Sequence, residues 1–174
     1  PTYMDFVDIA GLIKGASFGQ GLGNKFLAQI REMDVIAHVV RCFENSDIIH
    51  TSSPIDPIKD TEIIETELKL ADIETLENKI NSLQKKYKSG EKNIKEQLNL
   101  VNVLLKSLNE QTQINFKNCS DEQLQIIKDL NLITFKPMLY ICNVDEKSIV
   151  SGNNLSNLIQ EKSQKENKPS VIVS

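Results

Sequence analysis

The chain has 174 residues, of which 40% are hydrophobic and 25% are charged, and its formal net charge is −4. This length suits one domain, or one domain with an insertion, and suffices for a core without disulfide or metal support. The acidic balance excludes nucleic-acid binding driven by overall charge, and no apolar run is long enough for a membrane span. Three scattered cysteines predict neither a zinc site nor a disulfide framework, so we expect reduced thiols and a cytoplasmic protein.

The first quarter of the chain has α/β character. Residues 3–8 predict a short strand, which runs into a glycine-rich stretch from Gly11 to Gly23. Asn24 is a predicted N-cap for a helix over residues 25–33. Residues 35–40 are nearly all apolar, which predicts a strand buried on both faces.

A linker over residues 52–57 precedes a long helical region. Residues 60–131 contain no proline and a single glycine, Gly90. Apolar residues spaced by three and four predict a coiled-coil hairpin of two antiparallel helices, with its turn near Gly90. Ser120 and Gln123 form a capping box, which predicts a third helix. The two seams are Ile73, Leu76, Ile80, Leu83 and Tyr87, then Ile94, Leu98, Val101, Leu105 and Leu108.

The α/β character returns near the end. Residues 137–142 predict a strand, followed by a helix over residues 154–165 and a last strand over residues 170–173. Strands that alternate with helices predict a parallel, doubly wound sheet, so the fold class is α/β with an inserted helical hairpin. The predicted domain parts are residues 1–57 and 134–174 for the sheet and residues 58–133 for the insertion.

Asp8 and Gly11 are the first candidate site residues. Asp8 ends a predicted strand, at the sheet edge where ligands bind, and a carboxylate there can hold Mg²⁺ through water. A glycine three residues later lets a backbone N–H approach a terminal phosphate. The glycine-rich stretch that follows is typical of a switch loop ordered by phosphate and Mg²⁺. Taken alone, the Asp8–Gly11 pattern is also explained by a turn capped by the Asp, and the glycine-rich stretch by a surface loop.

Residues 143–146, Asn-Val-Asp-Glu, directly follow another strand and so reach the same edge. An amide there can hold a base edge and a carboxylate can accept from a base amine. The alternative is an ordinary turn, because Asn and Asp are common turn residues.

Taken together, these segments resemble a known family. Residues 6–17 (FVDIAGLIKGAS), 21–27 (GLGNKFL) and 38–45 (HVVRCFEN) are similar to the YchF-type Obg-like ATPases of the P-loop GTPase superfamily. The resemblance covers essentially the whole chain and implies a partial G-domain sheet that carries the helical insertion. It also implies Mg²⁺-dependent ATP binding and hydrolysis, with GTP as an alternative nucleotide, and a regulatory switch linked to the ribosome.

The resemblance assigns roles to individual residues. Asp8 would serve Mg²⁺ and Gly11 the γ-phosphate, as in switch II. Leu12 takes the place of a water-orienting glutamine, so no catalytic residue is assigned. Asn143, Val144 and Glu146 match the base-recognition loop, where the valine and the longer acid disrupt a guanine clamp and the Val144 backbone would approach adenine.

The family's phosphate-binding loop, switch I and TGS domain have no counterpart in these residues, and we expect a piece of a longer protein. The rival hypothesis is a non-catalytic helical-hairpin binding module, or an inactive fragment. A G-x-x-x-x-G-K-[ST] motif upstream in the full gene would decide between them. Lysines around the hairpin end, at positions 85, 86, 88, 92 and 95, are either a solvated helix end or a contact for RNA or the ribosome.

Overall fold

The structure is a computed structural model that describes residues 3–9, 22–44, 55–88, 94–110, 112 and 116–174. The chain forms two compact units. The sheet unit holds residues 1–14, 32–66 and 136–174, and the helical unit holds residues 15–31 and 67–135. Each unit has a hydrophobic core of its own.

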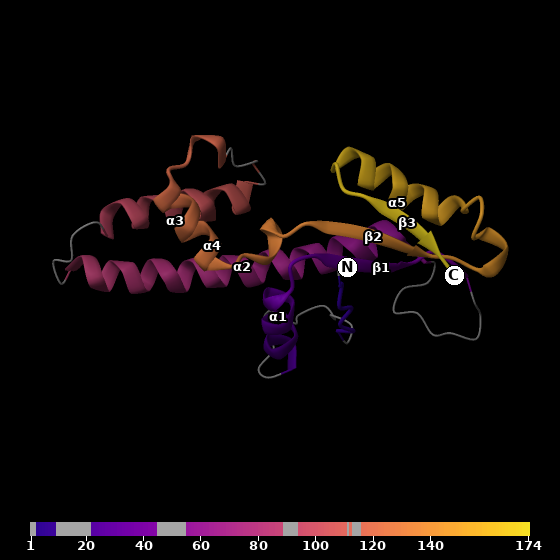
Figure 1. Cartoon of the computed structure of the whole chain (residues 1–174), viewed down its shortest axis with the longest axis horizontal. Coiled ribbons are helices and arrows are strands. Elements are labelled where there is room, and N and C mark those ends of the chain that lie inside the picture. Colours follow the sequence, from indigo (N-terminus) through magenta and orange to yellow (C-terminus); the bar gives the residue numbers. More distant parts are fainter. Residues whose placement is uncertain (1–2, 10–21, 45–54, 89–93, 111, 113–115) are drawn as a thin grey trace. The chain divides into compact units, whose positions relative to one another are not determined.

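A three-stranded parallel sheet organises the first unit. Its strands are β1 (Ile36–Arg41), β2 (Met138–Asn143) and β3 (Ser170–Val173), in the order β1-β2-β3. The helix α5 (Asn154–Lys165) connects β2 to β3 as a crossover (Figure 1). The predicted parallel α/β sheet is therefore confirmed: β1 and β2 are shifted by one residue from the prediction, and β3 has the predicted bounds.

One face of this sheet is covered by helices. The buried side chains of alternate strand positions pack against α5 and the start of the long helix α2 (Pro57–Lys88). The other face of β1 is open, since Val39 is 60% exposed. The prediction of a strand buried on both faces is therefore wrong: β1 is an edge of the described sheet and alternates as one-sided strands do. The core consists of Val40, Cys42, Tyr140, Cys142, Val144 and Ile159.

Residues 3–9 do not form the predicted strand. Their apolar side chains are open to solvent, with Tyr3 87% and Phe6 81% exposed. Strand geometry needs a hydrogen-bonding neighbour, and no strand among the described residues pairs with this segment. A β-prone composition alone therefore does not make a strand here.

The helix α2 begins earlier than the sequence predicts. Pro57 is its first residue, and the Asp56 carboxylate accepts from the Lys59 N–H at 3.1 Å. Proline is favoured at the first helical position because its missing N–H would be unpaired there. The last residue of the predicted linker, Pro57, is therefore the first residue of α2. Residues 57–66 of α2 belong to the sheet unit and the rest to the helical unit.

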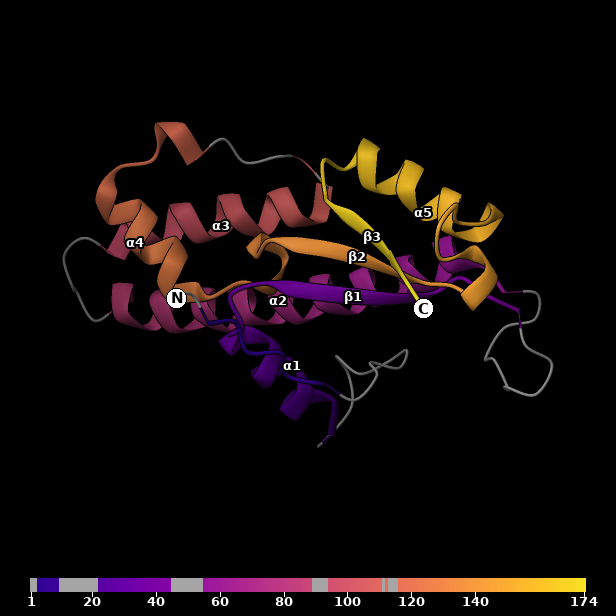
Figure 2. The ribbon, with the colours of Figure 1, turned by 45° about the vertical axis from the view of Figure 1, so that its right-hand side comes forward.

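The helical unit is built on α2 and α3 (Ile94–Glu110), with α4 (Asp121–Leu130) packed against them (Figure 2). Seam residues from both long helices are buried together, while Tyr87 is 53% exposed and lies outside the core. The two predicted long helices are confirmed as α2 and α3. The predicted break and turn near Gly90 lie outside the described residues, and coiled-coil geometry stays a prediction. The core consists of Leu76, Ile80, Leu83, Ile94, Val101, Leu104, Leu130 and Leu132.

Helix α1 (Leu22–Glu32) starts before Asn24, so the predicted N-cap is wrong. Asn24 has Leu27, not Glu or Gln, three residues later and cannot form a capping box. Ser120 does have Gln123, and both bonds of that box are present. The domain limits at 57/58 and 133/134 stay a prediction; the compact units part at 66/67 and 135/136, and α1 groups with the helical unit.

Candidate functional site

Three strand ends meet at the carboxyl edge of the sheet. Arg41, Asn143 and Val173 lie in register at the ends of β1, β2 and β3. The ladder continues one residue further: the Cys42 N–H donates to the Asn143 carbonyl at 2.7 Å, and the Val144 N–H donates to the Val173 carbonyl at 2.9 Å. Ligands of open parallel sheets bind beyond this edge, which makes Asn143 a candidate for ligand contact.

The residues from Asn143 to Glu146, at the end of β2 and just after it, differ in burial and in hydrogen bonding. Val144 is buried at 3% exposure and its N–H is used in the ladder. The Asp145 carboxylate caps the short 3-10 helix η3 (Glu146–Ser148) and accepts from the Ser148 N–H and hydroxyl, each at 3.1 Å. Glu146 is exposed and Asn143 half-buried. Asp145 is exposed as well, but its carboxylate is engaged in the cap, so Asn143 and Glu146 stay the candidates for ligand contact.

Asn153 fixes the same edge from the helix side, a role that the sequence reasoning missed. Its side-chain oxygen accepts from the Ser156 N–H at 2.9 Å and caps α5, while its amide nitrogen donates to the Cys42 carbonyl at 2.7 Å. Gly152 precedes it at φ +70°, where a Cβ would lie 2.8 Å from the Ser156 hydroxyl. Asn153 before a helical pattern was the signal that could have revealed this cap.

Arg41 is a second edge residue that the sequence reasoning missed. Its Nε donates to the Phe43 carbonyl at 3.2 Å and its guanidinium lies 4.8 Å from the centre of the Phe43 ring. Behind the edge, Cys42 and Cys142 are fully buried in the sheet core. Their mutual hydrogen bond and burial raise the pKa of the Cys42 thiol, which is consistent with a core role.

The switch II candidates are only partly described. Asp8 is exposed and lies in the irregular segment 3–9, and no hydrogen bond or ion pair among the described residues joins it to Asn143 or Glu146. Gly11 and Leu12 lie outside the described residues. The structure therefore brings together the base-loop candidates, but not Asp8 with them.

An exposed carboxylate such as Asp8 fits a hydrated Mg²⁺, which keeps several waters and takes one or two carboxylates. Over the part of the chain that the structure covers, no three His, Cys, Asp or Glu side chains gather as a metal site. A Mg²⁺ held here would therefore depend on waters and nucleotide phosphates for its remaining ligands. Among the described helices, none has the length and apolarity that crossing a membrane requires.

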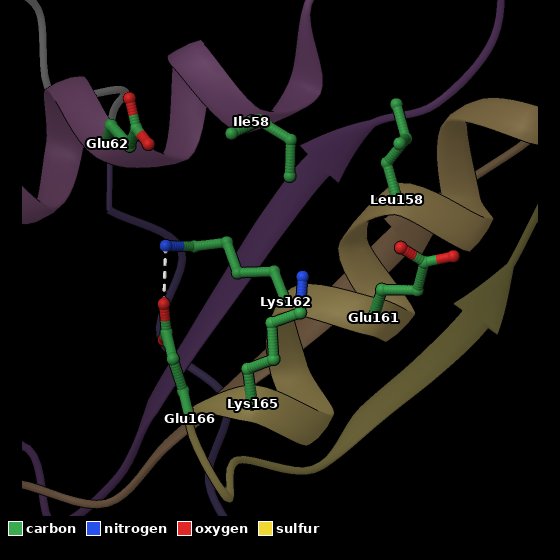
Figure 3. A pocket seen from close by; sticks show the side chains of 7 residues that line it. All are labelled: Ile58, Glu62, Leu158, Glu161, Lys162, Lys165 and Glu166. Carbon is green, nitrogen blue, oxygen red and sulfur yellow. Dashed lines mark hydrogen bonds and ion pairs between the residues drawn. The ribbon is translucent and has the colours of Figure 1, made fainter.

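A cavity of about 310 Å³ lies between α2 and α5 in the sheet unit (Figure 3). Its lining combines the apolar side chains of Ile58 and Leu158 with three carboxylates and two lysines. Carboxylates repel phosphate, and no candidate residue from the sequence lines this cavity. The cavity therefore gives no support for a nucleotide site. Its charged lining residues are Glu62, Glu161, Lys162, Lys165 and Glu166.

A charged cluster stabilises the covered side of the sheet, formed by Glu65, Tyr140, Lys162, Glu166 and Lys168. The Tyr140 hydroxyl hydrogen-bonds to the Glu65 carboxylate and to that of Glu166, the latter at 2.8 Å. Lys162 lies 3.0 Å from Glu65, and Lys168 lies 2.6 Å from Glu166. Burial and the bonds to both carboxylates raise the pKa of Tyr140, so the phenol stays protonated and α2, β2 and α5 stay tied together.

We expect Glu166→Gln to weaken the pH dependence of stability. Burial alone would raise the pKa of Glu166, but hydrogen bonds from Lys162, Lys168 and Tyr140 outweigh it and lower the pKa to about 2. The folded pKa is depressed, so the carboxylate adds stability above the unfolded pKa of about 4.3, and this stability is lost as pH falls toward 2.

Solvent screening limits the contribution of Glu166 to about 1 kcal/mol or less. Urea unfolding at about pH 6 and about pH 3 measures it, and the variant should lose less stability than the parent between the two. Glu161→Gln, at an exposed position of α5, is the control and should behave like the parent protein. Equal pH dependence in Glu166→Gln and the parent would contradict the assignment.

Several known proteins that are similar to this chain are named YchF. Residues 2–79 match a family model described as 50S ribosome-binding GTPase. The ribosome-binding ATPase YchF of Haemophilus influenzae is 52% identical over 146 residues, which make up 84% of this chain and 40% of that protein. The YchF of Bacillus subtilis is 41% identical over 175 residues, 99% of this chain and 48% of that protein. The chain thus spans less than half the length of these relatives.

A solved structure extends the similarity to the fold. The structure of the Schizosaccharomyces pombe YchF GTPase matches with a TM-score of 0.74 and 33% sequence identity. The match covers 95% of this chain and 46% of that chain. The matched part of the chain therefore includes residues of both the sheet unit and the helical unit. The fold is a partial P-loop GTPase fold.

Proposed function

Because the chain belongs to the YchF family, we propose that the complete protein binds and hydrolyses ATP with Mg²⁺, and that this chain supplies its switch II segment and base-recognition loop. The observation that supports this most is the carboxyl edge of the sheet, because Asn143 ends β2 there in register with Arg41 and Val173, and ligands of open parallel sheets bind beyond such an edge. Relatives that cover nearly the whole chain are named ribosome-binding ATPases.

The roles follow from the chemistry of each group. Asp8 would hold hydrated Mg²⁺, which neutralises charge that develops on the phosphates, and the Gly11 N–H would donate to the γ-phosphate. Asn143 and Glu146 would meet the base. The Val144 N–H is committed to β3, so the adenine amine would find the Val144 carbonyl. Leu12 cannot orient water, so another group must do so.

The base loop favours ATP because it lacks a guanine clamp, and we expect Glu146→Asp to raise the preference for GTP relative to ATP by about tenfold. The shorter acid restores the carboxylate position that accepts from two guanine donors, and one charge-assisted hydrogen bond contributes about 1.5–3 kcal/mol. Val144→Lys is avoided because Val144 is buried. Competition titrations of both nucleotides with the complete protein measure the ratio.

Glu122→Asp, an exposed acidic residue in α4, is the matched control and should leave the ratio unchanged. An unchanged ratio in Glu146→Asp would refute the role of this loop in base choice. Absence of any nucleotide binding by the folded, complete protein would instead favour the non-catalytic hairpin module.

We propose that the end of the hairpin contacts the ribosome. The protein would then act in the cytoplasm. Residues 79–95 hold six lysines and one glutamate, whereas the whole chain has net charge −4. Lys85, Lys86 and Lys88 form the exposed last turn of α2, and Lys95 is exposed in the first turn of α3. Clustered lysines attract phosphates and release counterions, so ribosomal RNA is the fitting partner.

We expect the double variant Lys85→Gln, Lys88→Gln to weaken ribosome binding and to reduce its salt dependence. Each lysine that no longer neutralises a phosphate should lower the slope of log K against log salt by about 1. Co-sedimentation with ribosomes over a salt series measures the slope. Lys106→Gln, which replaces an exposed lysine of α3 paired with Glu110, should leave the slope unchanged. An unchanged slope in the double variant would exclude these lysines as the contact.

A further inference from the structure

The last turn of α1 is bound to the base of the hairpin by a dense set of hydrogen bonds. Arg31 of α1 donates from Nη1 to the Asp72 carboxylate at 2.9 Å and to the Asn131 carbonyl at 3.0 Å. Its Nη2 donates to the Ala71 carbonyl at 3.1 Å and to the Thr75 hydroxyl at 2.8 Å. One guanidinium thus contacts both α2 and the end of α4, and the planar fork holds it in one orientation.

The contact is reciprocal. Asn131, in the left-handed conformation that ends α4, donates its side-chain amide to the Arg31 carbonyl at 2.8 Å. Asp72 is fully buried, and it also accepts from the Ile133 N–H at 3.0 Å and from the Thr134 N–H and hydroxyl at 2.7 and 2.8 Å. Each group is therefore held by more than one partner, and we call these residues the Arg31–Asp72 node.

Burial in α1 and the division of the chain into compact units agree with this association. Leu27 and Ile30 of α1 are 6% and 5% exposed. Residues 22–31 fall in one compact unit with α2 from residue 67 onward, although their sequence position would assign them to the sheet. The helix that directly follows the predicted switch II segment therefore belongs to the compact unit of the hairpin.

From this geometry we propose that Arg31 is a positioning residue that links switch II to the hairpin. The inference rests on the proposed function, in which the nucleotide acts on switch II and the hairpin meets the ribosome. Because the Arg31–Asp72 node joins α1 to α2 and to residues 131–134, a displacement of α1 carries the base of the hairpin with it. The node sets how strongly the bound nucleotide changes ribosome affinity, without touching the nucleotide.

The test compares ribosome affinity of the complete protein with ATP and with ADP. In the parent protein the two affinities should differ by roughly fivefold or more. Arg31→Met removes the guanidinium but keeps the apolar stem, and should bring the two affinities within about twofold while ATP affinity itself stays unchanged. Arg31→Lys, which can still reach Asp72 with a single ammonium, should keep part of the difference. Lys106→Met removes an exposed hairpin cation outside the node and should keep all of it.

Hydrogen exchange of the unmutated complete protein gives a readout that does not depend on a variant folding. When ADP replaces ATP, the protection of the α1 amides from hydrogen exchange should change together with that of the Ile133 and Thr134 amides. A nucleotide-dependent difference that survives in Arg31→Met, or a change in α1 alone, would overturn the link and leave the proposed function intact. No difference between ATP and ADP in the parent protein would overturn the link together with the switch itself.

Discussion

Asp72→Ala should lower the free energy of unfolding of the helical unit by about 3–5 kcal/mol, the range for breaking a buried charge pair from one side. Asp72 is fully buried, and its carboxylate is the common acceptor for Arg31 and for the backbone of residues 133–134. Alanine leaves a half-buried guanidinium without its counter-charge and two N–H groups without an acceptor. Urea unfolding followed by far-UV circular dichroism, which reports on helices, measures the loss.

Glu77→Ala provides the matched control on the same helix. Glu77 is exposed, so its removal should change the free energy of unfolding by about 0.5 kcal/mol or less. Arg31→Met combined with Asp72→Ala should cost less than the sum of the two single variants, because each single change already breaks the shared contact. A loss below about 1 kcal/mol in Asp72→Ala would show that the node contributes little to stability.

Asp8→Asn should lower ATP hydrolysis by the complete protein about 100-fold or more. The neutral amide cannot offer the negative charge that holds hydrated Mg²⁺, and a metal ion contributes several kcal/mol to stabilising transition-state charge. Each 1.4 kcal/mol corresponds to a factor of ten in rate. Phosphate release under steady-state conditions with Mg²⁺ measures the effect.

Asp5→Asn is the control for Asp8→Asn. Asp5 is also exposed, lies in the same segment of residues 3–9 and is removed from Asp8 by three positions. Hydrolysis should therefore stay near that of the parent protein. Equal rates in Asp8→Asn and Asp5→Asn would exclude Asp8 as a metal residue.

Local signals predicted helices well where two sequence features agreed. Ser120 with Gln123 predicted the start of α4, and both capping bonds are present. Asn24 is a cap-type residue without a capping-box partner three residues later, and α1 starts before it. The Asp56-Pro57 pair looked like a linker by composition, yet Asp56 caps α2 and Pro57 opens it. A single turn-type residue is thus ambiguous, because caps and turns use the same side chains.

Non-local contacts could not be predicted from these residues. The strand over residues 3–8 was predicted from composition, but a strand also needs a neighbour, and the described sheet gives it none. Arg31 and Asp72 are separated by 41 positions, and no periodicity marks their pairing. At the edge, Asn143 was predicted to follow a strand directly, but it is the last residue of β2, and only the structure shows that the Asp145 carboxylate caps η3.

In the complete protein, the carboxyl edge at Asn143 and Glu146 is the proposed binding site for ATP. Calorimetric titration with Mg²⁺ and ATP, on the parent protein and on Asn143→Ala, tests this site. One ATP should bind per parent chain, and Asn143→Ala should bind about tenfold more weakly, as expected for the loss of one base contact. A complete, folded protein that binds no ATP, or an Asn143→Ala variant with unchanged affinity, would contradict the claim.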